Sequence, residues 1–187
     1  MKPHSPKPTI SGIQAVETLL AEIGEDMTRE GLMNTPKRVV NALREMTKGY
    51  QEDPQQILST TFQAEYDEMI IIRSIPFWSL CEHHMLPFGG SATIGYIPNG
   101  RVVGLSKIAR LVHCFAHRLQ IQERLTVDIA KAIREYLQPL GVGVVIKASH
   151  TCMEMRGVKT KGEMTTSCLL GIMRGAARGE FLRLHHG

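Results

Sequence analysis

The chain has 187 residues, of which 43% are hydrophobic, and a formal net charge of +4. This length and composition allow a sizeable core, and the dispersed basic residues fit an anionic small molecule better than a nucleic-acid partner. No stretch approaches the roughly 20 apolar residues of a membrane span, and the chain begins without a signal-peptide core. We therefore expect a cytoplasmic protein with no membrane partner.

The first part of the chain predicts a tail followed by helices. Residues 1–10 are rich in proline and are expected to form a mobile tail. Apolar residues recur at helical spacing after Ser11, a typical helix cap, and a second helix is predicted to begin at Thr35-Pro36. Asp53-Pro54 predicts the start of a short third helix. We interpret residues 11–59 as an N-terminal helical region.

Residues 60–187 predict a different architecture, in which strands come before and after two helices. Pro98-Asn99-Gly100 is a hairpin signal that leads into Val102-Val103, and Ser106 is expected to cap the first of the two helices. The order ββααββ indicates an α+β fold with an antiparallel sheet and helices on one face. The expected strands are residues 68–77, 90–97, 142–146 and 164–172, and the expected helices are residues 106–116 and 127–137.

A metal-binding motif follows the first of these strands, in the sequence Cys81-Glu82-His83-His84. Cys81 and His84 have the Cys-x-x-His spacing with which a tight turn directs a thiolate and an imidazole at one zinc ion. A third ligand has to come from elsewhere, and the best candidate segment is Ser149–Met153, which contains another cysteine and histidine. Two cysteines and one histidine leave a fourth position open to water, as in catalytic zinc sites.

The alternative interpretation of each of these residues is structural. A lone cysteine is more often a small buried hydrophobe than a ligand, and we interpret Cys114 and Cys168 as core residues. The consecutive polar residues Glu82, His83 and His84 are different, because they interrupt an apolar stretch in which burial without partners would be costly. The cluster therefore favours a metal or catalytic site.

The chain contains four ordered motifs, Cys81–His84, Gly104–Arg110, Gln120–Thr126 and His150–Val158, which are preceded by Thr35–Arg38. Together these segments resemble the motifs of the GTP cyclohydrolase I family. The resemblance implies the tunnelling fold for a catalytic domain of residues 60–187, and a ring-forming homodecamer with composite active sites. It also implies conversion of GTP to 7,8-dihydroneopterin triphosphate and formate, the first step of pterin and folate biosynthesis.

The same resemblance assigns roles around a Zn²⁺ cofactor. Its ligands are expected to be Cys81, His84 and Cys152, and zinc hydroxide would attack guanine C8. His83 and His150 are the expected proton-transfer pair, with His150 serving N7 of guanine and His83 assisting ribose ring opening.

The resemblance also implies a set of substrate-binding residues. Gln122 and Glu123 are expected to read guanine. Lys107, Arg110 and Arg156 would clamp the triphosphate, with Arg38 added from a neighbouring subunit. The full expected set is Glu82, Ser106, Lys107, Arg110, Gln122, Glu123, Arg156 and Arg38.

Two other functions compete with this one. A structural zinc module in a binding protein would explain neither the missing fourth ligand nor the two further histidines. A relative of the same fold with changed chemistry, such as a nitrile reductase, would rely on a catalytic cysteine without this set of zinc ligands. Zinc content and formate release separate the three.

Overall fold

The computed structural model describes residues 9–186, in two compact units that divide between Met46 and Thr47. The first unit contains α1 (Gly12–Glu22) and α2 (Thr35–Met46). Ser11 caps α1 as predicted, because its Oγ accepts from the N–H of Gln14 and the Gln14 side chain accepts from the N–H of Ser11. Most of the predicted tail, residues 1–8, lies outside the described residues.

The second unit begins with two short helices, η1 (Lys48–Gln51) and α3 (Pro54–Leu58). Asp53 caps α3, as its sequence predicts, by accepting from the N–H of Gln55 (2.9 Å). Both helices contact α4 (Leu105–Ala116), and Leu58 is buried in the main core. The sequence pattern placed η1 and α3 in the N-terminal helical region, residues 11–59. In the structure both helices belong to the unit that contains the sheet.

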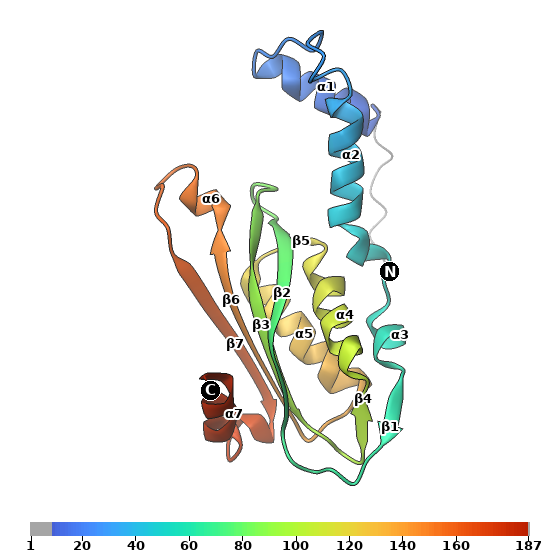
Figure 1. Ribbon diagram of the computed structural model, residues 1–187, viewed down its shortest axis with the longest axis vertical. Coiled ribbons are helices and arrows are strands. Elements are labelled where there is room, and N and C mark those ends of the chain that lie inside the picture. Colours follow the sequence, from blue (N-terminus) through green and yellow to red (C-terminus); the bar gives the residue numbers. More distant parts are fainter. Residues whose placement is uncertain (1–8, 187) are drawn as a thin grey trace. The chain divides into compact units, whose positions relative to one another are not determined.

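A five-stranded sheet forms the centre of the second unit. Its strands are β2 (Ile70–Cys81), β3 (Pro87–Ile97), β5 (Leu119–Gln120), β6 (Gly141–His150) and β7 (Glu163–Gly171). In space they follow the order β5-β2-β3-β6-β7, and neighbours are antiparallel except for β5, which runs parallel to β2 (Figure 1). The long elements therefore follow the predicted order ββααββ, and the fold class is α+β.

Two helices, α4 and α5 (Gln122–Tyr136), cover one face of this sheet (Figure 1). Side chains alternate between the two faces along each strand, and those on this face are buried against the apolar sides of the helices. Among residues 9–186, no helix is both long enough and apolar enough to cross a membrane. Large buried side chains of this core include Phe88, Ile94, Tyr96, Ile108, Leu111, Leu125, Ile129 and Ile146.

The opposite face is also covered in part, which corrects the prediction that helices lie on one face only. The helix α7 (Arg178–His186) packs there and contacts β2. Phe181 of α7 is fully buried, and its ring lies against Gly95 of β3 and Gly143 of β6. A Cβ atom at these glycines would meet the ring at 2.7 and 2.8 Å, so the two glycines make room for the helix.

Two local predictions around the start of α4 were wrong. The turn at residues 98–100 is present, but β4 (Arg101–Val103) pairs with β1 (Thr61–Gln63) in a separate two-stranded sheet, so no hairpin with β3 forms. Gly104 is the N-cap of α4, and Ser106 lies inside the first turn. The pairing of β4 with β1, which lies far away in the sequence, accounts for both differences, because it fixes where β4 ends and α4 begins.

Candidate metal centre and active site

The predicted Cys-x-x-His motif forms the turn between β2 and β3. Cys81 is the last residue of β2, and its N–H donates to the carbonyl oxygen of Leu86 (2.8 Å). The carbonyl oxygen of Cys81 accepts from the N–H of Met85 (2.7 Å), which has a left-handed φ of 55°. This tight turn leaves 3.8 Å between Cys81 Sγ and His84 Nδ1.

The third predicted ligand reaches the turn because β6 pairs with β3. The register places the end of β6 opposite the start of β3. The short helix α6 (Thr151–Glu154) therefore begins beside the turn, and Thr151 Oγ1 donates to the carbonyl oxygen of Pro87 (2.6 Å). The structure brings the three predicted ligands together, with their ligand atoms within 4.8 Å of one another: Cys81, His84 and Cys152.

These three side chains fit a tetrahedral zinc ion. Zn–S bonds of about 2.3 Å and Zn–N bonds of about 2.0 Å place neighbouring ligands about 3.6 Å apart, close to the separation of Cys81 Sγ and His84 Nδ1. Burial, and then the neighbouring Cys81, raise the pKa of the Cys152 thiol, whereas a metal cation favours the thiolate. Within residues 9–186 the group has three members, so a tetrahedral ion held there keeps one position for a further ligand.

His83 lies in the same turn and faces solvent. Its side chain is 65% exposed, and its Nδ1 is 3.9 Å from Cys81 Sγ. Its ring meets the ring of His84 edge-on, with the centroids 6.3 Å apart. His83 is therefore beside the predicted metal ligands and exposed to solvent.

His150 ends β6 and is held between β3 and α5. Its ring stacks on Phe88 of β3, with the centroids 4.6 Å apart and an interplanar angle of 5°. Its Nε2 is 2.8 Å from Oε1 of Gln122. Burial lowers the pKa of the imidazole, and the carboxylates of Glu123 and Glu154 act in the opposite direction. The ring has a defined orientation, and desolvation favours its neutral form.

The two residues predicted to read guanine have different surroundings. Glu123 is exposed in the first turn of α5, and its charge acts on His150. Gln122 is only 1% exposed, and its amide nitrogen lies within 3.2 Å of three acceptors on β6 and β7. Both hydrogens of that amide are used inside the protein, so Glu123 is the side chain of the two that can meet a base.

Glu82 was expected to bind substrate, but its carboxylate forms an ion pair with Arg124 of α5. The Nε of Arg124 also donates to Oε1 of Gln120 (2.9 Å), and Gln120 pairs with Cys81 across β5 and β2. The pair therefore ties the ligand turn to α5. No role was predicted for Arg124 from the sequence. Its position within the motif Gln120–Thr126 was the one feature that could have indicated a role.

The two predicted arginines outside α4 lie in different units. Arg156 follows α6 in the second unit, and its Nη1 is 3.0 Å from His84 Nε2. Its exposed guanidinium is thus at the edge of the metal group, where an anion could approach. Arg38 belongs to α2 in the first unit and is exposed there.

The structure does not bring Ser106, Lys107 and Arg110 to the metal ligands. They lie in the first half of α4, which begins beside β4, at the end of the sheet away from α6 and the β2–β3 turn (Figure 1). The helix then runs back toward that turn. At about 1.5 Å per residue, Lys107 is roughly 14 Å farther from the ligand end than Ala116 is.

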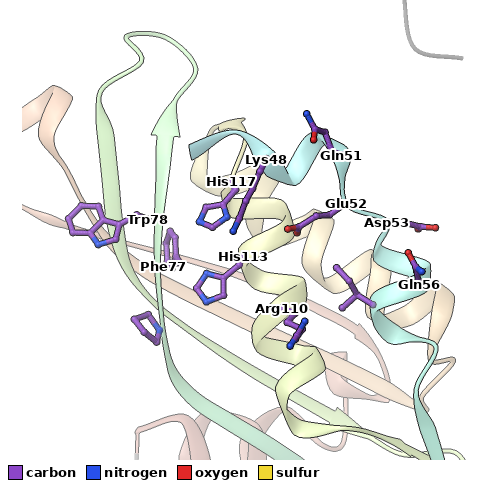
Figure 2. A pocket seen from close by; sticks show the side chains of 12 residues that line it. Lys48, Gln51, Glu52, Asp53, Gln56, Phe77, Trp78, Arg110, His113 and His117 are labelled. Carbon is purple, nitrogen blue, oxygen red and sulfur yellow. The ribbon is translucent and has the colours of Figure 1, made fainter. Parts of the chain in front are cut away.

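Arg110 instead lines a cavity of about 750 Å³ between η1, β2 and α4. Figure 2 shows Arg110 and His113 on α4, His117 directly after its end, and Lys48 and Glu52 on the segment that precedes α3. None of the three predicted metal ligands lines this cavity. Within a single chain, the basic residues of α4 and the metal group are therefore separate.

A family model and individual known proteins all match the chain to the same family. The family model described as GTP cyclohydrolase I matches residues 13–186. The chain is 54% identical over 171 residues to GTP cyclohydrolase 1 of Janthinobacterium sp. (strain Marseille), which covers 89% of this chain and 86% of that protein. It is 52% identical over 179 residues to GTP cyclohydrolase 1 of Saccharomyces cerevisiae, which covers 94% of this chain and 73% of that protein.

These matches identify the α+β chain with its Cys/His/Cys group as an enzyme. It belongs to the GTP cyclohydrolase I family. The resemblance that four sequence motifs indicated is thereby confirmed.

Replacing Cys81 or Cys152 by serine is expected to abolish metal binding, since each supplies one of three ligands. The matched control is Cys168→Ser, because this thiol is half-buried in β7 and outside the group. Zinc per chain, measured after dialysis against metal-free buffer, is expected to be near zero in the first two variants and unchanged in the control. Wild-type zinc content in both ligand variants would contradict the assignment.

Proposed function

We propose that this protein hydrolyses GTP to 7,8-dihydroneopterin triphosphate and formate with a zinc ion held by Cys81, His84 and Cys152. One observation carries the proposal: in a chain of this family, three ligand atoms converge beside two further histidines, His83 in the same turn and His150 at the N-cap of α6, the helix that carries Cys152. A structural zinc site usually has four protein ligands, so the three-ligand group supports a catalytic site.

The side chains around the group suit a guanine nucleotide. The exposed carboxylate of Glu123 can accept both N–H donors on the Watson–Crick edge of guanine. Adenine presents an acceptor at N1, which would face that carboxylate, and such hydrogen-bonded sites reject the wrong base by roughly 10⁴-fold. The guanidinium of Arg156 can bind phosphate oxygens in a bidentate manner.

Opening the imidazole ring of guanine requires a nucleophile at C8 and a proton at N7. When bound, a zinc ion supplies a water nucleophile that is active near neutral pH. His150, held beside the metal group, delivers the proton to N7, and its ring is already oriented by Phe88. His83, which is exposed in the ligand turn, assists the opening of the ribose ring.

The site is completed by a second copy of the chain in a ring-shaped homo-oligomer, a homodecamer by family resemblance. In this arrangement Lys107 and Arg110 of one copy clamp the phosphates of GTP bound at the metal group of the next, and Arg38 of another copy adds a further cation. The separation of α4's basic residues from the metal group supports this assembly. Two exposed strand edges also support it. Among the described residues no strand pairs with the outer edge of β7, and β5 pairs with only the last two residues of β2, so both edges can pair with another chain.

Zinc-loaded protein incubated with GTP is expected to release one formate per GTP and to form a dihydropterin, detected by absorbance and by fluorescence after oxidation. Protein stripped of metal with a chelator is expected to be inactive until zinc is restored, because the nucleophile depends on the ion. ATP is the matched control substrate and is expected to yield no formate. Absence of formate from GTP with zinc bound would contradict the proposed reaction.

Mixed oligomers test whether two copies share one site. Cys152→Ser removes the metal half and Arg110→Ala the phosphate half, so each variant alone is expected to be inactive. A random equal mixture of the two chains assembles both intact halves in about one quarter of its sites, and about one quarter of wild-type activity is expected. Chain exchange is verified with differently tagged variants. Activity no higher than the two variants' sum in verified mixed oligomers would contradict shared sites.

A further inference from the structure

The orientation of the Gln122 side-chain amide is decided by the strands that surround it. Its Nε2 lies 3.0 Å from the carbonyl oxygen of Ile146, 2.9 Å from that of Met164 and 3.2 Å from Thr166 Oγ1. A carbonyl oxygen can only accept, so an amide oxygen in this position would face two acceptors without a hydrogen between them. The nitrogen must therefore point toward β6 and β7, and Oε1 must point toward His150.

The same reasoning fixes the hydrogen on His150. Gln122 Oε1 accepts and cannot donate, and His150 Nε2 lies 2.8 Å from it. Nε2 must then carry the hydrogen, and in the neutral ring the lone pair lies on Nδ1. We infer that Gln122 is a positioning residue that fixes the tautomer of His150 and leaves Nδ1 as the nitrogen that exchanges protons with the substrate. The inference rests on the proposed proton-transfer role of His150.

The imidazole ring of His150 is held against flipping. Phe88, which is fully buried, stacks on it at an interplanar angle of 5°, and the cross-strand register places the two residues opposite each other. A ring flip would turn a carbon toward Gln122 Oε1 and lose the hydrogen bond in a buried position, where an unpaired acceptor is unfavourable. The hydrogen bond and the stacking together select one orientation.

The anchor of Gln122 is itself rigid. Thr126 Oγ1 donates to the backbone carbonyl oxygen of Gln122 (2.7 Å) and lies 2.7 Å from Thr166 Oγ1. Gln122 and Thr126 are each 1% exposed, so this network joins α5 to β7 away from water. A positioning role also explains why Gln122 is buried although it was expected to read a base.

Nuclear magnetic resonance of the zinc-loaded wild-type protein, labelled with ¹⁵N-histidine, tests the tautomer directly. Long-range ¹⁵N–¹H correlations distinguish the two neutral forms, and the signal of His150 is identified by its loss in His150→Gln. We expect the form protonated at Nε2, and a signal for the form protonated at Nδ1 would overturn the inference. This measurement needs no turnover, so its outcome is independent of whether GTP is the substrate.

Steady-state kinetics separate positioning from base recognition. Gln122→Met keeps the approximate volume but lacks the acceptor, and we expect kcat to fall about 10- to 100-fold with KM for GTP within about two-fold of wild type. Glu123→Gln, the comparison variant, is expected to raise KM because it alters the base reader. Unchanged kcat in a folded Gln122→Met would overturn the positioning role, whether or not KM rises. If Gln122→Met fails to fold, the tautomer measurement decides.

Discussion

The pairing of β3 with both β2 and β6 is the constraint on which the site depends. One register brings the turn that carries Cys81 and His84 to the start of β3, and the other brings the end of β6 opposite the same point. A slip of one residue in either pairing would move every side chain of that strand to the other face. The sheet thus places Cys152 beside residues far away in the sequence and presents the ligands from rigid elements.

Much of this arrangement was predictable because the decisive patterns are local. The Cys-x-x-His spacing of Cys81 and His84 predicted a turn that binds metal, and the structure closes that turn on Cys81. Cys152 could be selected as the third ligand because the segment Ser149–Met153 contains both a further cysteine and a further histidine. Apolar, β-branched runs and apolar residues at helical spacing likewise predicted the order ββααββ, and Cys114, expected in the core, is fully buried.

The features that the sequence did not predict all depend on contacts between distant segments. No local pattern shows that Phe181 fills the space above Gly95 and Gly143, so the helix on the second face was missed. The direction of the Gln122 amide follows from carbonyl groups on β6 and β7, which a motif cannot reveal. The distance of Lys107 from the metal group follows from the course of α4, which the motif Gly104–Arg110 alone does not reveal.

X-ray absorption at the zinc edge tests the central claim most directly, namely that two thiolates and one imidazole hold the ion and leave one exchangeable position. In the zinc-loaded oligomer we expect two sulfur atoms at about 2.3 Å and two nitrogen or oxygen atoms at about 2.0 Å. Addition of GTP is expected to change the shell of light atoms and to leave both sulfur atoms in place. A shell with three or more sulfur atoms, or with fewer than two, would contradict a site built from Cys81, His84 and Cys152.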